Sequence, residues 1–485
     1  MPNETSVIDG VGKELFIGGA WTQATGGKTF AVHDPASGAV LCQVADAAPA
    51  DGRAALDASV AAQEAWAAHP PRERGEILRR AYQAMTDRVD ELALLMTLEM
   101  GKPLAESRGE IAYAAEFFRW FAEESVRIDG GYATAPGGTG RFLVTKQPVG
   151  PSLLITPWNF PMAMGTRKIG PAVAAGCTMV IKPASQTPLC MLALARILAD
   201  AGLPEGVLNV LTTTDSGGVM EPLIRDGRAR KLSFTGSTAV GRKLLEQCSD
   251  KVLRTSLELG GNAPFLVFAD ADLDAALDGA MLAKMRNIGE ACTAANRFLV
   301  QRDVAEEFAR RMAERMAAQP IGRGTEEGVV VGPLIDEAAV TKVSSLVDDA
   351  TERGARVLTG GSTVDGPGNF YRPTVLADVP TDARMAKEEI FGPVAPISVF
   401  DTEDEAVRIA NDTEYGLVSY LYTSDLKRAL RVAERLEVGM IGLNQGIVSN
   451  PAAPFGGVKQ SGLGREGGSV GIDEFLETKY IAVAM

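Results

Sequence analysis

The 485-residue chain contains almost no histidine: His33 and His69 are the only two. A Ser-His-Asp triad, or a zinc site built on paired histidines, would have to use these two residues, and their spacing is not that of metal ligands. We therefore expect neither histidine-based catalysis nor a metal site.

Cysteine is also scarce. The five cysteines are scattered and include no C-x-x-C pair: Cys42, Cys177, Cys190, Cys248 and Cys292. This pattern argues against a disulfide framework and fits a reducing compartment. The N-terminal MPNETSVIDG lacks the basic and apolar regions of a signal peptide, and no apolar run reaches about 18 residues. We expect a cytoplasmic protein that does not enter a membrane.

A basic excess is missing too, because 48 Lys and Arg residues stand against 62 Asp and Glu, a net charge of −14. Bulk electrostatics then repel nucleic acid and anionic membranes, so neither is expected as a partner. What is present is an ordinary globular composition, with 46% hydrophobic and 23% charged residues. At roughly 150 residues per domain, the length predicts about three domains.

The order of sequence patterns predicts an α/β protein with a projecting arm. Residues 49–125 have helical apolar spacing, and a glycine-rich stretch at 129–140 predicts turns within a β-hairpin. From 151 to 235, short apolar strands alternate with helices, which indicates a parallel sheet covered on both faces. A second such set follows Pro264. The tail LETKYIAVA predicts an edge strand that pairs with the hairpin or across a subunit boundary.

Two nucleotide-binding patterns are rejected. Residues 462–467, GLGREG, match G-x-G-x-x-G, but only about twenty residues follow, too few for the βαβ unit that gives this pattern meaning. Residues 236–241 have P-loop spacing, yet Arg242 and Lys243 stand where Lys and then Ser or Thr are required. A nucleotide triphosphatase is therefore not expected.

Two polar positions in the first α/β segment have two interpretations each. The turn at 235–238 precedes a helix whose first backbone N–H groups could hold a phosphate, or Ser237 or Thr238 is a plain N-cap. Lys182 ends the strand TMVIK at the carboxyl edge of the sheet, where α/β folds bind ligands, or it is a lysine extending to solvent.

Four further segments have compositions that structure alone does not require. ITPWNFP holds Asn159 in a rigid turn as a donor facing a cleft. LELGGN places Glu258 at a strand end beside two glycines, and NIGEACTAANRF places Cys292 among small residues. EEIFGP offers Glu389 and Phe391 before a strand.

These four segments, together with IKPAS, FTGST and APFGGVKQSGLGREGG in this order, resemble the aldehyde dehydrogenase superfamily over nearly the whole chain. The resemblance implies a discontinuous Rossmann-like dinucleotide-binding domain at 1–125 and 143–257, and a catalytic α/β domain at 258–452. It also implies an oligomerisation arm at 126–142 and 470–485, and hence a homodimer or homotetramer.

Carried over by residue, the resemblance implies that Cys292 is the nucleophile and Glu258 the general base. Asn159 and the backbone N–H of Cys292 would form the oxyanion hole. A thiohemiacetal would lose hydride to the nicotinamide, and water activated by Glu258 would hydrolyse the resulting thioester. A non-catalytic binding protein with the same fold is the alternative from another functional class.

The resemblance also implies cofactor-binding positions. They are Trp158, Lys182, Ser185, Gly236, Ser237, Leu259, Glu389 and Phe391. Relatives that prefer NAD often have glutamate where Ser185 stands, and serine beside Lys182 accommodates a 2′-phosphate. We therefore expect NADP, with NAD as the alternative.

Arg167, Arg286 and Ser449 resemble the succinate-semialdehyde dehydrogenase subgroup. Arginine binds a carboxylate through two parallel hydrogen bonds, so the expected substrate is succinic semialdehyde. Glutarate semialdehyde stays open, since one methylene changes binding by only about 0.8 kcal/mol. A broad-specificity enzyme, with both arginines paired to acids on helix surfaces, is the other alternative.

Two positions near the nucleophile depart from the family pattern. Glu290 stands where glutamine is common, which adds a second carboxyl group near Cys292. Ala294 stands where several succinate-semialdehyde dehydrogenases have a second cysteine, so a regulatory disulfide is not expected.

Overall fold

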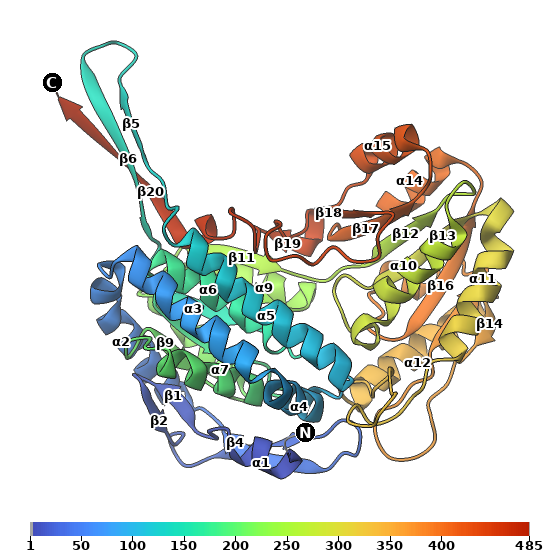
Figure 1. The fold of residues 1–485 in the computed structure, drawn as a ribbon, viewed down its shortest axis with the longest axis horizontal. Helices are drawn as coiled ribbons and strands as arrows, with labels where there is room; N and C mark the ends of the chain where they lie inside the picture. The colour runs from blue at the N-terminus through green and yellow to red at the C-terminus, as the bar shows by residue number, and fades with distance from the viewer. Residues whose placement is uncertain (1–2, 485) are drawn as a thin grey trace.

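The computed structural model describes residues 3–484, which form two α/β units and a projecting three-stranded arm (Figure 1). The first unit is built on an eight-stranded sheet with the order β19-β11-β10-β7-β8-β9-β1-β2. Its strands are β1 (Leu15–Ile17), β2 (Ala20–Thr22), β7 (Ser152–Ile155), β8 (Met179–Lys182), β9 (Leu208–Val210), β10 (Lys231–Thr235), β11 (Arg254–Glu258) and β19 (Gly462–Leu463). The central strands are parallel, as predicted: β11, β10, β7, β8 and β9. At the two edges of the sheet, β19, β1 and β2 pair antiparallel.

Helices cover both faces of this sheet. They are α1 (Glu4–Asp9), α2 (Pro49–Ala67), α3 (Pro71–Asp87), α4 (Val89–Met100), α5 (Leu104–Glu124), α6 (Ala163–Ala175), α7 (Leu189–Asp200), α8 (Ser216–Asp226) and α9 (Thr238–Ser249). The predicted helical region 49–125 is confirmed as α2 to α5. Pro71 starts α3 at a position where proline is favoured, and Gly101, with φ +93°, ends α4 in the left-handed region.

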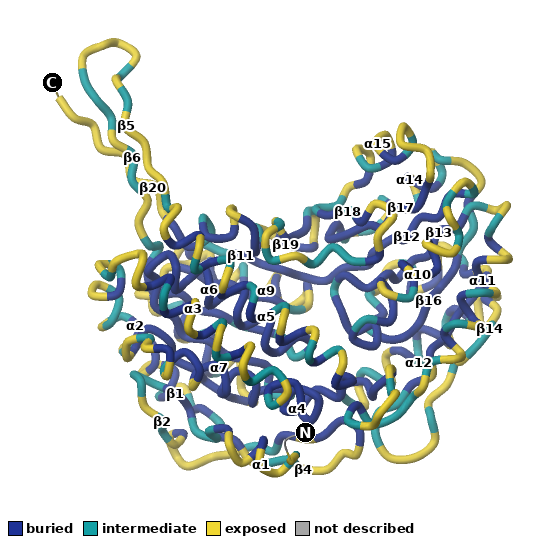
Figure 2. Tube along the Cα trace, viewed as in Figure 1, coloured by how far each residue is buried: buried dark blue, intermediate teal, exposed yellow. Residues whose placement is uncertain are grey.

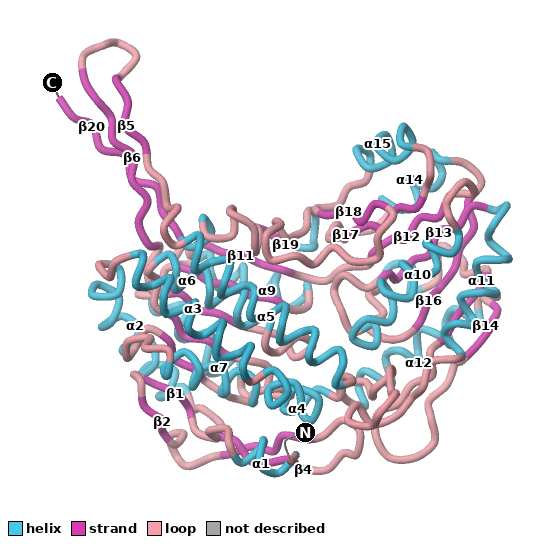
Figure 3. The backbone as a smooth tube through the Cα atoms, in the orientation of Figure 1, coloured by secondary structure: helices cyan, strands magenta, loops and turns pink. Residues whose placement is uncertain are grey.

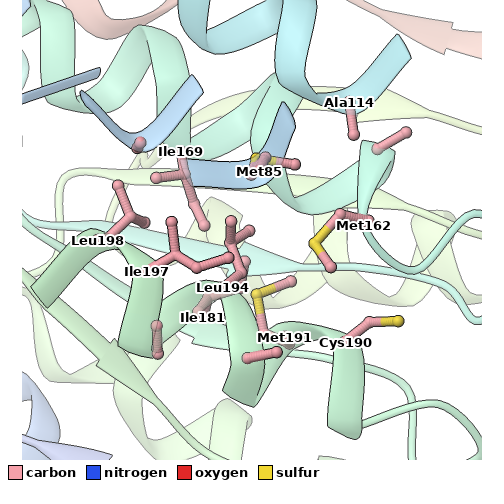
Figure 4. Close-up of a cluster of buried hydrophobic side chains, with 14 of the residues drawn as sticks. Met85, Ala114, Met162, Ile169, Ile181, Cys190, Met191, Leu194, Ile197 and Leu198 are labelled. Carbon is pink, nitrogen blue, oxygen red and sulfur yellow. The ribbon is translucent and has the colours of Figure 1, made fainter. Parts of the chain in front are cut away.

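Alternate residues of the central strands point to opposite cores. Leu154 and Ile181 pack with α3 to α7, whereas Leu153 and Val180 pack with α2, α8 and α9. Figure 4 shows part of the first core, in which Ile181 of β8 lies among helix residues such as Ile169 and Leu194. Burial on both faces explains why these strands are short continuous apolar runs.

The second unit is built on a seven-stranded sheet with the order β14-β15-β16-β13-β12-β17-β18. Its strands are β12 (Ala263–Val267), β13 (Ala295–Gln301), β14 (Arg356–Thr359), β15 (Thr374–Ala377), β16 (Val394–Phe400), β17 (Val418–Tyr422) and β18 (Met440–Leu443). Its helices are α10 (Leu273–Met285), α11 (Arg302–Ala317), α12 (Glu337–Glu352), α13 (Arg384–Lys387), α14 (Glu403–Asn411) and α15 (Leu426–Arg435). Short 3₁₀ turns lie at Arg286–Gly289, Lys459–Ser461 and Asp473–Phe475. The second predicted α/β unit is thus confirmed.

The arm consists of β5 (Gly131–Thr134), β6 (Gly140–Pro148) and β20 (Leu476–Ala484), all antiparallel (Figure 3). It projects from the body, and most of its residues are exposed or intermediate, in contrast to the buried sheets (Figure 2). The tail therefore pairs with the hairpin of its own chain, one of the two predicted arrangements. Strand β6 continues to Pro148, beyond the predicted limit of the arm at residue 142.

A separate two-stranded sheet, β3 (Thr29–His33) and β4 (Val40–Ala45), lies in the N-terminal part. Within residues 3–484, no helix combines the length and the apolar character needed to cross a membrane.

Candidate active site

A cavity of about 350 Å³ lies between the carboxyl ends of the first parallel sheet and the second α/β unit. This is where open α/β sheets bind ligands. Nine residues of its wall are relevant here: Trp158, Asn159, Gly236, Ser237, Leu259, Cys292, Ile335, Glu389 and Phe391. Eight of the predicted catalytic and cofactor positions, all of these residues except Ile335, therefore line one cavity.

The loop that carries Cys292 has an unusual backbone. After α10, the residues Asn287, Ile288 and Gly289 have φ values of +54°, +61° and +78°. Two consecutive non-glycine residues in the left-handed region cost free energy, so the surrounding contacts must maintain them. The Asn287 side chain does so by donating to the carbonyl oxygens of Asn159 (3.0 Å) and Glu290 (2.8 Å).

Asn159 is fixed in the turn between β7 and α6. Its Nδ2 donates to the carbonyl oxygen of Glu290 at 2.9 Å. An amide nitrogen carries two N–H groups, so the second is available for an oxyanion in the cavity. The carbonyl oxygen of Asn159 accepts from the Lys102 ammonium at 2.8 Å, and Lys102 forms a buried ion pair with Glu110. Sequence analysis missed these two supporting residues, because neither lies in a segment of unusual composition.

Cys292 lines the cavity with partial exposure. Burial and the nearby Glu389 carboxyl raise the pKa of its thiol to about 12, although Arg167 and Arg286 act in the opposite direction. Close packing of the LELGGN segment positions the thiol, since a Cβ atom on Gly261 would collide with the carbonyl oxygen of Cys292. The glycine is therefore required for this approach.

Glu258 ends β11 and is buried, and its carboxyl group does not form part of the cavity wall described above. Burial and the neighbouring Glu466 carboxylate raise the pKa of Glu258 well above its usual value. Its Oε2 has no hydrogen-bond partner within residues 3–484. Burial therefore favours the protonated form of Glu258, and its carboxylate becomes a stronger base than an exposed one.

Glu466 is a third residue that sequence analysis missed. It lies in the GLGREG segment, and it forms buried ion pairs with Arg167 and Lys168 of α6. The signal was the G-x-G-x-x-G match, which was correctly rejected as a dinucleotide fingerprint. Residues 462–463 of that segment are the edge strand β19.

The cofactor positions divide into two groups. Trp158 and Phe391 are in edge-to-face contact, with ring centroids 5.5 Å apart, beside Glu389, whose pKa burial raises to about 7. Ser237 is the N-cap of α9 and also lines the cavity, so its two interpretations are compatible.

Lys182 and Ser185 lie apart from this group. Ser185 lines a second cavity of about 410 Å³, and Ile335 and Asp336 line both cavities, which are therefore neighbours. The Lys182 ammonium is buried and makes no ion pair or hydrogen bond with another described residue, and this burial lowers its pKa to about 8. An unpaired, buried ammonium group fits an anionic ligand group.

Arg286 and Ser449 line a third cavity, of about 900 Å³. Arg286 Nη1 donates to Ser449 Oγ at 3.2 Å, and its guanidinium lies 4.9 Å from the Phe160 ring centroid. Among the described acids, none is within ion-pair distance of Arg286. Pairing with a surface acid is therefore wrong for this residue.

Arg167 is not brought to the Arg286 cavity. Its Nε lies 2.7 Å from Glu466 Oε2, and its guanidinium stacks 4.0 Å from the Phe455 ring centroid. It does pair with an acid, but in the core and not on a helix surface. Its Nη2 has no partner in the described part of the chain. That Arg167 binds the substrate carboxylate therefore stays a prediction. In this structure, the carboxylate that Arg167 contacts is that of Glu466.

The chain is similar to known proteins over nearly its whole length. Residues 21–481 match the model of the aldehyde dehydrogenase family. The chain is 60% identical over 445 residues to succinate-semialdehyde dehydrogenase of Paenarthrobacter nicotinovorans, covering 92% of this chain and 99% of the relative. It is 51% identical to glutarate-semialdehyde dehydrogenase of Pseudomonas putida, with 98% of both chains covered.

The fold is likewise similar to solved structures. The crystal structure of an NADP-dependent enzyme of E. coli superposes with a TM-score of 0.97 at 51% identity, covering 98% of each chain. Succinate-semialdehyde dehydrogenase from Burkholderia pseudomallei gives the same TM-score at 49% identity, again with 98% of each chain covered. From the family match over residues 21–481 and these full-length similarities, the chain belongs to the aldehyde dehydrogenase family.

Proposed function

We propose that this enzyme oxidises succinic semialdehyde to succinate with NADP as hydride acceptor. The observation that supports this substrate is the guanidinium group of Arg286. It forms no ion pair with an acid among residues 3–484, contacts Ser449 and lines a cavity separate from that of Cys292. The names of the relatives from P. nicotinovorans and P. putida support a semialdehyde that carries a carboxylate.

The carboxylate and the aldehyde would bind on two sides of one turn. Phe160 lines the Arg286 cavity, and the adjacent Asn159 lines the Cys292 cavity. A four-carbon substrate whose carboxylate is held by Arg286 could thus present its aldehyde to Cys292. Charge-assisted hydrogen bonds of this kind contribute about 1.5–3 kcal/mol.

In the proposed reaction, the Cys292 thiol gives its proton to water, and the thiolate sulfur attacks the aldehyde carbon. The amide of Asn159 and the backbone N–H of Cys292 stabilise the oxyanion of the thiohemiacetal. When bound, a nicotinamide would supply the acceptor for the hydride that the thiohemiacetal carbon loses as its oxyanion re-forms the carbonyl of a thioester. Glu258 then takes a proton from water, whose oxygen attacks the thioester carbon, and succinate leaves as Cys292 regains its thiol.

The residues present fit a dinucleotide cofactor. The α9 N-terminus at Ser237 opens onto the cavity, and the buried ammonium group of Lys182, at the end of β8, has no ion-pair partner among residues 3–484. An uncharged Ser185 near this cation favours NADP, and NAD is the alternative. The relative named succinate-semialdehyde dehydrogenase [NADP(+)] GabD from E. coli, 51% identical over 98% of both chains, supports this choice.

A panel of aldehydes tests the proposal. Rates of nicotinamide reduction are compared for succinic semialdehyde, glutarate semialdehyde and uncharged butanal, each with NADP and with NAD. We expect the highest kcat/KM for succinic semialdehyde with NADP. Equal values for butanal would contradict the proposed role of Arg286, and a higher value for glutarate semialdehyde would assign the longer substrate.

We further propose that the enzyme is a cytoplasmic homodimer or homotetramer. Five free cysteines support a reducing compartment. The projecting arm supports oligomerisation, because its exposed aromatic residues and free strand edges are typical of surfaces that another subunit covers.

A further inference from the structure

Glu290 is a buried carboxyl group two residues before Cys292, and the proposed reaction does not use it. Its side chain has no measurable exposure, and its Oε1 accepts a hydrogen bond from the backbone N–H of Ile335 at 3.1 Å. Its Oε2 is buried and has no partner among residues 3–484. A buried polar group at such a place requires a physical explanation.

The Ile335 bond connects two parts of the site that are distant in sequence. Ile335 and Asp336 precede α12, and together with Lys342 of that helix they line the Cys292 cavity. The Glu290 side chain therefore ties this wall to the loop that carries the nucleophile. Among residues 3–484, Glu290 is the side chain that accepts a hydrogen bond from the Ile335 N–H.

The backbone of Glu290 makes the second connection. Its carbonyl oxygen accepts from Asn159 Nδ2 at 2.9 Å and from Asn287 Nδ2 at 2.8 Å. One residue thus contacts both the proposed oxyanion donor and the far wall of the cavity. A shift of Glu290 would move both relative to Cys292.

We propose that Glu290 is a positioning residue that holds the Ile335 wall of the cofactor cavity, and with it Asn159, at a fixed place relative to Cys292. This inference rests on the proposed function, because it takes the Cys292 cavity to be the cofactor site. It assigns Glu290 no contact with the reacting atoms.

Glutamine is the natural mimic of this group. Burial and Asp336 raise the pKa of Glu290 well above its usual value, while the Ile335 N–H and Lys102 lower it. The raised pKa favours the neutral acid, and the Ile335 N–H needs only the acceptor oxygen Oε1. A Glu290→Gln side chain has the same length and keeps the acceptor oxygen, whereas Glu290→Ala removes it and Glu290→Met fills the volume without it.

The test compares these three variants with Glu306→Ala, a change at an exposed position of α11. NADP binding is measured without aldehyde by calorimetry, kcat and both KM values by steady-state kinetics, and the alkylation rate of Cys292 by iodoacetamide in the free enzyme. We expect Glu290→Ala and Glu290→Met to weaken NADP binding about fivefold or more and to lower kcat. The KM for the semialdehyde should change less than twofold.

Rescue by the conservative variant separates positioning from mere packing. Glu290→Gln should stay within twofold of wild type in NADP affinity, kcat and alkylation rate, as should Glu306→Ala. Should Glu290→Ala fail to fold, Glu290→Met gives the same comparison. Wild-type NADP binding and kcat in Glu290→Met, or a defect in Glu290→Gln as large as in Glu290→Met, would overturn this inference alone. Failure of the wild-type enzyme to bind NADP or NAD would overturn the proposed function as well.

Discussion

At the scale of single residues, some charged side chains of the site already form ion pairs within residues 3–484, and others do not. Lys102 and Glu110 form an ion pair, and the Lys102 ammonium also donates to the carbonyl oxygen of Asn159, which fixes this turn. Within residues 3–484, no carboxylate forms an ion pair with Arg286 or with Lys182. A buried charge without a partner is costly unless a ligand compensates it, so we expect anionic groups to bind at these two cations.

Replacing Arg286 by glutamine should reduce kcat/KM for succinic semialdehyde by about 10- to 150-fold, the loss of one charge-assisted interaction of about 1.5–3 kcal/mol. Butanal, which has no carboxylate, should be oxidised as before. Arg315→Gln is the matched control, because Arg315 lines the same cavity but is already paired with Asp278. Steady-state kinetics with both aldehydes test this expectation. An equal loss of kcat/KM for butanal would contradict it, because the substitution would then act on the loop that carries Cys292.

The pH dependence follows from two raised pKa values. Burial raises the pKa of Cys292 to about 12 and that of Glu258 well above its ordinary value, so both reactive groups are protonated at low pH. Raising the pH increases the thiolate form of Cys292 and the carboxylate form of Glu258, which are the active forms in the proposed reaction. The kcat/KM should therefore increase continuously from pH 6 to pH 9. A maximum near pH 6 followed by a decline would contradict these protonation states.

At the scale of elements, the strands show what a sequence can predict. β7, β8 and β10 are short apolar runs buried on both faces, and they were predicted. β1 to β4 were not predicted, because several of their residues are partly exposed and their apolar pattern is weak. β19 has only two residues and exists through pairing with β11, with Leu463 opposite Leu257. Such a strand has no local signal.

The candidate site shows the same division. Cys292, Asn159 and Glu389 were found because they stand in segments of unusual composition. The left-handed pair Asn287 and Ile288 could not be predicted, since neither residue type requires a positive φ. Tertiary contacts maintain this turn. The side chains that support Asn159, Lys102 and Asn287 among them, are therefore identified only from the structure.

The β11–β12 connection provides a test at this scale. A methyl group on Gly261 would collide with the carbonyl oxygen of Cys292, so Gly261→Ala should displace the nucleophile loop. We expect a loss of at least about 100-fold in kcat, in line with the effect of small misplacements of reacting groups. Gly217→Ala, at a position with open space around it, is the control. Activity within twofold of wild type would show that the loop adjusts freely.

At the scale of the whole molecule, the arm projects from the body, and most of its residues are exposed or half-buried. Tyr132 of β5 and Tyr480 of β20 are 69% and 65% exposed. Large exposed aromatic side chains on a projecting sheet are typical of a surface that a second subunit buries. Here the sequence predicted the strands and their pairing, but it contains no information on which surface they would meet.

Charges on the arm should disrupt assembly. The double variant Tyr132→Glu and Tyr480→Glu should shift the mass measured by light scattering from an oligomer toward a monomer, because burial of two carboxylates opposes association. Glu477→Gln, on the same strand, is the control. A wild-type enzyme that is monomeric, or an oligomer that the double variant leaves intact, would exclude the arm as the interface.

The central claim is that Cys292 carries the acyl group and Glu258 releases it. The most direct measurement mixes Glu258→Gln enzyme with succinic semialdehyde and NADP, quenches it with acid and determines the mass of the intact protein and its peptides. The account predicts rapid formation of about one NADPH per active site, and a succinyl group on the peptide that contains Cys292. An unmodified Cys292 peptide, or an acyl group on another residue, would contradict it.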